Sequence, residues 1–269
     1  MEAGNRYTYN QGKMWGWIKR ITVGMLVGFL AAIGYVFVTY TYSIQKLRDR
    51  DPSSTSLIDT RIAEAQARGQ QPRRVQTWVP LERISPSLQR AVLAGEDANF
   101  ATHNGFDYAA LQRAWDEAQR EAEKEAKQEG EDPSSWNWNV PTFKRGASTI
   151  TQQLAKNLYL STERSFLRKG REAVITFFLE RELSKRRILE IYLNVIEWGD
   201  GIYGAEAASQ FYFNKPASEL TPREAAFLAA MIPSPLNIFN PQKNLKRVQR
   251  RQRVLLRGMQ FVKMPQGTG

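Results

Sequence analysis

The chain has 269 residues, of which 42% are hydrophobic and 24% are charged, a balance typical of one globular domain with a short additional segment. This composition excludes collagen, coiled coils and disorder over the whole length, and the lack of cysteine with a single histidine excludes thiol nucleophiles, disulfides and two-histidine zinc motifs. A formal net charge of +11 predicts an anionic partner, and nucleic acid, anionic lipid and a phosphorylated substrate all fit that description.

An uncharged apolar run occupies residues 21–42. At ~1.5 Å per residue, a helix of this length spans the ~30 Å apolar core of a bilayer. We therefore predict one transmembrane helix, with a cytoplasmic N-terminus at 1–20 and a juxtamembrane tether containing one short helix at 43–74. A linker without a helix is the more common alternative for the tether. A cleaved signal peptide is the alternative, but its apolar region is usually only ~7 to 15 residues long. The basic residues on the two sides of the run favour, by a small margin, an N-terminus inside the cell.

The body at 75–260 is predicted to be mainly helical. Isoleucine, leucine and alanine recur there at steps of three and four residues, and alternating strand patterns are scarce. Ser85 followed by Pro86 indicates one helix start, and Thr221 with Glu224 indicates another that has a capping box. Residues 261–269 are assigned to a tail.

An acidic insertion interrupts this body. Residues 116–132 hold eight acidic and three basic side chains and no large apolar residue, so they form either a solvated helix or a disordered segment. Aromatic and cationic residues typical of an interfacial loop follow it: Trp136, Trp138, Phe143, Lys144 and Arg145. A packed core hairpin is the alternative for these residues. We treat 116–139 as an acidic insertion that includes a candidate membrane-facing loop.

Two polar segments bring carboxylates together with groups that can assist them. Residues 96–107 contain Glu96, Asp97 and His103 near glycines that permit tight turns. Arg168 and Glu172 lie one helical turn apart in the segment 168–180. Each feature also has a structural interpretation. Arg168 and Glu172 could form an ordinary helix ion pair, which contributes only ~0.3 to 0.5 kcal/mol. A lone histidine such as His103 is often structural, and the acidic pair Glu96–Asp97 could cap a loop.

A third polar segment, residues 146–160, predicts a helix that is entered through Gly146, with Thr149 as a candidate N-cap and Gln152 at the capping-box position. Helical spacing places Ile150 and Leu154 on a buried face. Thr149, Gln152 and Lys156 then fall on the opposite face, where a hydroxyl, an amide and a cation would be presented together. From the residues alone, the chain is a membrane-tethered helical domain with a cationic face that carries carboxylates.

Five segments, in order, resemble the motifs of the peptidoglycan glycosyltransferases (glycosyltransferase family 51). EDANFATHNGFD at 96–107 is similar to ED-x-x-F-x-x-H-x-G-[IF]-D, and GASTITQQLAKN at 146–157 to G-x-S-T-[IL]-T-Q-Q-L-x-K-N. RKGRE at 168–172 is similar to R-K-x-x-E, while 184–209 and 220–241 resemble the fourth and fifth motifs. Five motifs in the family's order are far more specific than any one of them. The acidic insertion departs from the pattern, so the resemblance says little about it.

The resemblance implies a mainly α, lysozyme-like domain with two lobes, the smaller dipping into the membrane. Such an enzyme would be a single-pass protein of the bacterial inner membrane with its catalytic domain on the periplasmic side. It would polymerise lipid II into β-1,4 glycan strands with inversion, releasing undecaprenyl pyrophosphate. Its expected partners are lipid II, the lipid-linked strand, membrane lipids and other cell-wall synthesis proteins, and not nucleic acid. We expect no penicillin-binding transpeptidase domain, because the sequence ends soon after the last predicted helix.

The resemblance also implies roles for individual residues. Glu96 would be the general base, and Glu172 the second essential glutamate, near the pyrophosphate, holding a divalent metal or orienting cations. Lys156 and Arg168 would stabilise the charge of the leaving group. The other expected substrate-binding residues are Asp97, Phe100, His103, Ser148, Thr149, Gln152, Gln153, Asn157 and Lys169. Mg²⁺ or Mn²⁺ suits a pyrophosphate, although no metal-ligand spacing demands one, and no organic cofactor is expected.

Three other functions compete with this one. A lysozyme-like hydrolase or lytic transglycosylase would need a protonated carboxylic acid for its alkoxide leaving group, whereas the cations around Arg168 favour a pyrophosphate donor. A non-catalytic cell-wall scaffold is the alternative from a different class. Nucleic-acid binding would explain the charge, but no recognition helix or aromatic RNA motif accompanies it. The basic run at 243–257 predicts contact with anionic lipid headgroups, or else a solvated terminal helix.

Overall fold

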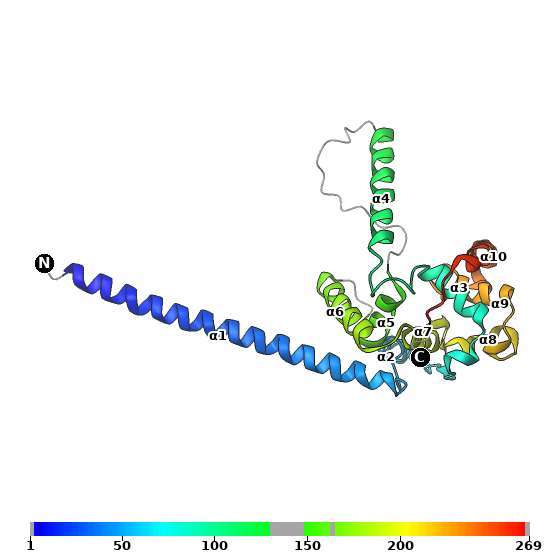
Figure 1. The fold of residues 1–269 in the computed structure, drawn as a ribbon, viewed down its shortest axis with the longest axis horizontal. Coiled ribbons are helices and arrows are strands. Elements are labelled where there is room, and N and C mark those ends of the chain that lie inside the picture. Colours follow the sequence, from blue (N-terminus) through cyan, green and yellow to red (C-terminus); the bar gives the residue numbers. More distant parts are fainter. Residues whose placement is uncertain (1–2, 130–147, 162–164, 267–269) are drawn as a thin grey trace. The chain divides into compact units, whose positions relative to one another are not determined.

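The computed structural model describes residues 3–129, 148–161 and 165–266, and the chain divides into two units, Met1–Lys46 and Leu47–Gly269 (Figure 1). The first unit consists of helix α1, Ala3–Gln45. The hydroxyls of Thr22 and Thr39 donate to the carbonyls four residues earlier, which satisfies both groups inside an apolar helix. Among the described residues, one helix, Trp17–Arg48, is long and apolar enough to cross a membrane. The prediction of an apolar helix over 21–42 is confirmed.

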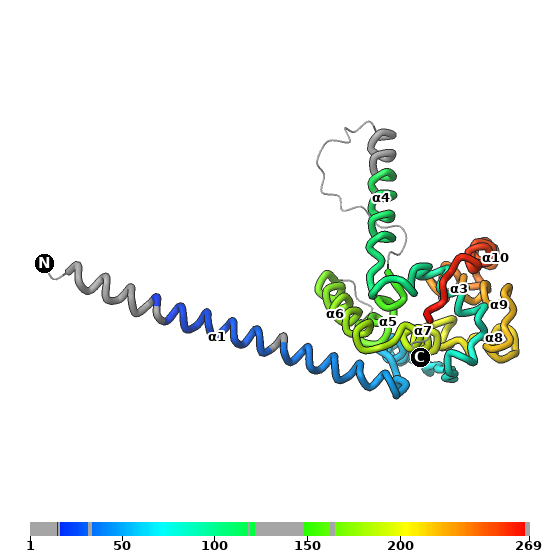
Figure 2. The backbone as a smooth tube through the Cα atoms, in the orientation of Figure 1, coloured from blue at the N-terminus to red at the C-terminus, as the bar shows by residue number. Residues whose placement is uncertain are grey.

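The second unit is mainly helical, as predicted, and Figure 2 follows its course by colour. Its first helices are α2 Ser56–Ala67, α3 Pro86–Glu96, α4 Tyr108–Glu129, α5 Ile150–Tyr159 and α6 Phe166–Glu182. Its later helices are α7 Lys185–Val195, α8 Ala205–Phe213, α9 Pro222–Met231 and α10 Pro241–Gly258. Short 3₁₀ turns are η1 Lys46–Arg48 at the start, η2 Leu81–Arg83, η3 Ala217–Glu219 and η4 Met259–Phe261. Helix α2 lies in the predicted tether, and its Ile58 is fully buried against the body.

The helix starts follow the capping signals in the sequence. The Ser85 hydroxyl accepts the Leu88 amide at 3.1 Å and thereby caps α3. Thr221 and Glu224 form a complete capping box at α9. A side-chain cap satisfies an amide that the helix leaves unpaired, and each is worth about 1 kcal/mol. These predicted starts are therefore confirmed.

A small sheet joins the helices near the middle of the second unit. Its strands are β1 Val75–Gln76, β2 Glu197–Gly199 and β3 Ile202–Tyr203, in the order β1-β3-β2. Strand β3 pairs parallel with β1 and antiparallel with β2. Gly204, which follows β3, has φ +84°, and a Cβ there would lie 2.7 Å from the Asn194 carbonyl oxygen. Only glycine fits this turn, because it tolerates positive φ and carries no Cβ.

The core holds two groups of helices that carry the polar segments. Helix α3 packs against α9 and α10, while α5 packs against α2, α6 and α7. Ile150 and Leu154 of α5 are fully buried, as their spacing predicts. Burying each such side chain contributes about 1.5 to 3 kcal/mol. The polar residues near α3 and α5 are thus held by rigid, well-packed elements.

The acidic insertion is helical where the structure describes it. Helix α4 includes residues 116–129, so the helical alternative is confirmed for that part. The end of the acidic segment and the aromatic and cationic residues after it lie outside the described residues: 130–132, Trp136, Trp138, Phe143, Lys144 and Arg145. Gly146, the predicted entry to α5, lies outside them as well.

Candidate active site

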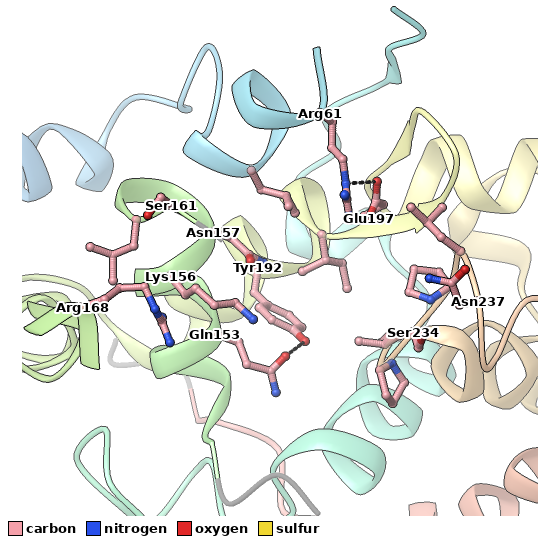
Figure 3. A pocket seen from close by; sticks show the side chains of 17 residues that line it. Arg61, Gln153, Lys156, Asn157, Ser161, Arg168, Tyr192, Glu197, Ser234 and Asn237 are labelled. Atoms are coloured by element: carbon pink, nitrogen blue, oxygen red, sulfur yellow. Dashed lines mark hydrogen bonds and ion pairs between the residues drawn. The ribbon is translucent and has the colours of Figure 1, made fainter. Parts of the chain in front are cut away.

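A pocket of about 390 Å³ opens between α2, α5, α6, α7 and the loop 232–237 (Figure 3). Lys156 of α5 and Arg168 of α6 line one end of it. Arg61 of α2 lines the other end, where its Nε and Nη2 each donate to Glu197 at 3.1 Å. Arg61 is therefore already paired with a carboxylate through two hydrogen bonds, whereas Lys156 and Arg168 at the first end are not paired in this way.

A second, smaller pocket of about 200 Å³ contains Glu96, together with Ser148 and Thr149. The Glu96 Oε2 atom accepts a hydrogen bond of 3.0 Å from Gln153 Nε2. Gln153 itself lines the larger pocket. The Glu96–Gln153 hydrogen bond consequently links a residue of the smaller pocket to a residue of the larger one.

Glu96, the last residue of α3, is a buried carboxylate with two partners. Arg251 Nη2 donates to its Oε1 at 2.9 Å, and its side chain is only 9% exposed. Burial raises the pKa of Glu96, while Arg251, the Gln153 hydrogen bond and the charge of Lys156 act in the opposite direction and do not cancel the rise. A carboxylate with a raised pKa is a stronger base than an ordinary one.

The orientation of Gln153 is set by Tyr192 of α7 (Figure 3). The Tyr192 hydroxyl donates to Gln153 Oε1 at 2.7 Å. Tyr192 is fully buried, and burial, with the charges of Glu96 and Asp97, raises its pKa well above the ordinary value. The phenol thus stays protonated as a donor, which leaves the amide nitrogen of Gln153 to face Glu96.

The cationic end of the larger pocket is built around Glu172. Glu172 is 3% exposed, accepts from Arg168 Nη1 at 3.0 Å and also pairs with Lys169. The Nε of Arg168 is buried and has no hydrogen-bond partner in the part of the chain that the structure describes. Much of Lys156 is exposed, yet desolvation of its ammonium lowers its pKa. The positive charges of Arg168 and Lys169 lower this pKa further, while the carboxylates of Glu172 and Glu96 act in the opposite direction. Such a cluster suits a multiply charged oxyanion.

Asp97 and His103 support the start of α5. Asp97 accepts from the Ile150 amide at 2.9 Å and from His103 Nε2 at 2.9 Å. The Gly105 amide donates to His103 Nδ1 at 3.1 Å, so the hydrogen-bond network places the ring proton on Nε2. Thr149 completes the link by donating to the Gly105 carbonyl at 2.7 Å. These bonds fix the segment 96–107 against α5 and so hold Glu96 next to Gln153.

The structure divides the predicted site residues into four groups. Those that line the larger pocket are Gln153, Lys156, Asn157 and Arg168, and those that line the smaller one are Glu96, Asp97, Ser148 and Thr149. Glu172 forms ion pairs with Arg168, which lines the larger pocket, and with Lys169. Phe100, His103 and Gln152 line neither pocket, and Phe100 is fully buried in the core.

The prediction that Gln152 shares an exposed polar face with Lys156 is wrong. Gln152 is buried, and its Oε1 accepts from the Thr149 amide at 3.0 Å within a capping box. At this position a glutamine side chain turns back to the helix start, so it cannot also reach a pocket. The neighbouring Gln153 supplies the amide that the site uses.

Several residues of the site are missing from the sequence-based set, and one of them, Arg251, lines neither pocket but contacts Glu96. Arg251 is one of seven basic residues at 243–257, and nothing in their spacing separates it from the others. Tyr192 lies within an apolar helical pattern, where a core role is the natural interpretation. Ser234 and Asn237 belong to the fifth motif segment, which was the only signal that could have indicated them.

Comparison with known proteins gives one consistent result. A family model described as Transglycosylase matches residues 62–130 and 135–260. A protein of Thiobacillus denitrificans named biosynthetic peptidoglycan transglycosylase is 42% identical over 252 residues, covering 94% of this chain and 98% of that protein. A protein of the same name from Bordetella pertussis is 40% identical over 255 residues, with 93% and 96% coverage. Another from an Azoarcus species is 43% identical over 222 residues, with 82% and 86% coverage.

Proposed function

The chain belongs to the transglycosylase family and is a peptidoglycan glycosyltransferase, and we propose that it polymerises lipid II with Glu96 as the general base. The observation that carries this proposal is the Glu96–Gln153 hydrogen bond, which links residues of two pockets. A transferase that joins two sugars needs a base within reach of both the acceptor and the donor. We place the donor in the larger, cationic pocket and the acceptor beside Glu96.

The reaction then follows from the residues around each pocket. The 4-hydroxyl oxygen of the acceptor sugar attacks the anomeric carbon of the donor, and Glu96 takes the hydroxyl proton as the carbon–oxygen bond forms. The bond from the anomeric carbon to the pyrophosphate oxygen breaks on the opposite side, which inverts the configuration. Undecaprenyl pyrophosphate leaves as a stable anion, so cations from Lys156 and Arg168 serve it better than a general acid.

Glu172 orients the cations in this proposal. Both of its carboxylate oxygens are engaged, one by Arg168 and one by Lys169. The described part of the chain holds no group of three or more histidine, cysteine, aspartate or glutamate residues able to bind a metal. These residues therefore do not fit a protein-held Mg²⁺ or Mn²⁺, and we assign no step to one. Where the reaction uses a divalent ion, we propose that the ion arrives on the substrate pyrophosphate.

The chain is anchored in a membrane by the apolar helix in α1. We propose that this is the bacterial inner membrane, with the second unit on the periplasmic side, where lipid II is used. Helix α6 supports contact between the second unit and lipid, because it exposes Phe166, Leu167, Val174 and Phe177. At 100° per residue, Phe177 lies about 180° around the helix from Arg168. One face of α6 would meet the bilayer while the other holds the pyrophosphate of a lipid-linked substrate.

Two further partners remain predictions. The exposed basic residues of α10 fit anionic headgroups, as expected from the run at 243–257. Contacts with other cell-wall synthesis proteins are likewise expected from the family alone.

Replacement of Phe166 and Phe177 together by serine is expected to lower polymerisation in lipid vesicles at least ~10-fold, because their loss removes apolar area that would enter the bilayer. The same variant should turn over a short-chain, water-soluble lipid II analogue at close to the wild-type rate. Phe261→Ser, at another exposed phenylalanine, is the control and should behave as wild type on both substrates. Equal losses on the two substrates would show that the α6 face acts through the fold rather than through lipid.

Adjacent glutamines in α5 provide a paired test of the site. Gln152→Ala is expected to lower the free energy of unfolding by about 1 kcal/mol, because it removes half of a capping box, and to leave the turnover of folded enzyme near wild type. Gln153→Ala is expected to lower turnover at least ~10-fold with a smaller effect on unfolding, because it releases Glu96 Oε2. Denaturant titration and lipid II assays measure the two effects. Lower turnover of folded Gln152→Ala, together with near wild-type turnover of Gln153→Ala, would contradict the site as described.

The function is tested with the full-length protein in detergent and purified lipid II. Loss of monomer and formation of a polymer that lysozyme digests are the expected results. Cutting of preformed glycan strands without consumption of lipid II would instead support a lytic enzyme. If folded protein changes neither lipid II nor glycan strands, the chain is a scaffold, and Glu96 is then not a catalytic base.

A further inference from the structure

Arg251 connects the last long helix to the carboxylate that we assign as the base. Helix α10 packs against α3 and α9, and from it the Arg251 Nη2 atom donates to the Gly95 carbonyl at 3.0 Å and to Glu96 Oε1 at 2.9 Å. The guanidinium also lies over the Phe239 ring, 5.6 Å from its centroid. The side chain is therefore held at three points.

Gly95 makes room for this arrangement. A Cβ at position 95 would lie 3.3 Å from Arg251 Nη2 and 3.2 Å from a methyl carbon of Leu255. Both distances are tighter than ordinary van der Waals contacts, so a side chain there would push the guanidinium and the Leu255 side chain away by a few tenths of an ångström. The absence of a side chain before Glu96 thus permits the close approach of α10.

We propose that Arg251 is the positioning residue of the general base, holding Oε1 of Glu96 so that Oε2, which contacts Gln153, faces the acceptor hydroxyl. This inference rests on the proposed function, since it assigns a partner to the base named there. Each carboxylate oxygen can accept two hydrogen bonds, so Oε2 keeps a free lone pair for the incoming proton after Gln153 has donated to it. Arg251 does not touch the substrate in this scheme and acts only through Glu96.

The charges around Glu96 make Arg251 the dominant cation. Lys156 from α5 contributes a weaker attraction, and Arg251 from α10 gives the largest effect that opposes burial. The other titratable groups that face this carboxylate or line its pocket are Asp97, Asp107, Arg113 and Tyr192. His103 is paired with Asp97 rather than with Glu96. Without Arg251 the pKa of Glu96 should therefore rise further, and the base should become protonated at a higher pH.

The experiment compares Arg251→Met with Arg250→Met in the full-length enzyme. Arg250 is an exposed neighbour on α10 with no described contact to Glu96, so its loss removes the same charge without touching the base. For Arg251→Met, kcat should fall at least ~10-fold with little change in KM, and the acid limb of the pH profile should move up by at least about one pH unit. For Arg250→Met the acid limb should stay where it is in the wild type.

Arg251→Lys separates charge from geometry. A lysine keeps a positive charge but cannot form the same directed hydrogen bonds, so the acid limb should stay near that of the wild type while kcat still falls. The position of the acid limb does not depend on the fraction of folded protein, so partial unfolding of Arg251→Met would not obscure it. If Arg251→Met does not fold, Gly95→Ala takes its place and should move the limb in the same direction.

The inference is overturned if the acid limb and kcat of Arg251→Met match those of Arg250→Met, or if Arg251→Lys retains full kcat. In those cases an inactive Glu96→Gln enzyme would still support the base itself. If instead Glu96→Gln polymerises lipid II normally, the proposed function of Glu96 fails, whatever Arg251 does.

Discussion

Replacement of Glu96 by glutamine is expected to abolish lipid II polymerisation, with kcat lowered at least ~100-fold and KM changed by only a few-fold. Glutamine has the size of glutamate and can still bond Gln153 or Arg251 through one oxygen, but it cannot accept the proton of the acceptor hydroxyl. The measurement is the loss of lipid II monomer with saturating substrate. Glu219→Gln, which alters an exposed carboxylate of η3 that lines neither pocket, is the matched control and should polymerise lipid II at close to the wild-type rate. A Glu96→Gln enzyme with more than a tenth of wild-type kcat would rule Glu96 out as the base.

The pH dependence of the wild type gives an independent check on the same residue. Burial raises the pKa of Glu96, and a general base works only when it is deprotonated. Activity should therefore be lost as the pH falls through this raised pKa, at a pH above the ordinary carboxyl value of about 4.3. A profile of kcat/KM for lipid II measures the position of this limb in the free enzyme. An acid limb at or below the ordinary carboxyl value would contradict the environment described for Glu96.

Replacement of Arg168 by methionine is expected to lower kcat by about 10² to 10³, because it removes a preorganised cation from the leaving pyrophosphate. Arg168 lines the larger pocket, and its buried Nε has no hydrogen-bond partner among the described residues, so this atom is available to an oxygen of the substrate. Inorganic pyrophosphate should inhibit the wild type, and at least ~10-fold more of it should be needed for the variant. Lys156→Met should behave similarly in both measurements.

Two controls separate this effect from loss of structure. Arg168 pairs with buried Glu172, and removal of one partner of a buried pair can cost about 3 to 5 kcal/mol, so Arg168→Lys and thermal unfolding are measured alongside. Arg186→Met removes an exposed cation of α7 that pairs with Glu82 and should polymerise lipid II at close to the wild-type rate. If pyrophosphate inhibits the Arg168→Met enzyme as strongly as the wild type, Arg168 does not bind the leaving group.

Local features of this fold could be predicted because their causes are local. The residues that form the caps at Ser85 and Thr221 lie within four positions of each helix start. The buried face of α5 follows from the spacing of its apolar residues. The motifs also pointed to Glu96, Lys156 and Arg168, which line the two pockets.

The parts that could not be predicted depend on contacts between distant segments. Arg251 lies 155 residues from Glu96, and only the packing of α10 on α3 brings them together. The capping role of Gln152 could be predicted from its spacing to Thr149, but nothing in the sequence showed that the adjacent Gln153 reaches Glu96. A helical wheel gives the direction of each side chain from the axis but not which hydrogen bond it finally makes.

The contact between the linings of the two pockets has a consequence for inhibitor design. A hydrogen bond of 3.0 Å joins Gln153, which lines the pocket that we propose for the donor, to Glu96, which lines the pocket that we propose for the acceptor. A compound anchored by an anionic group at Lys156 and Arg168 could be extended toward Glu96 with a neutral donor that replaces the Gln153 amide. Such a compound would occupy both substrate positions at once. Resistance through Gln153 would be costly to the bacterium, because the mutation that weakens the drug would also loosen the base.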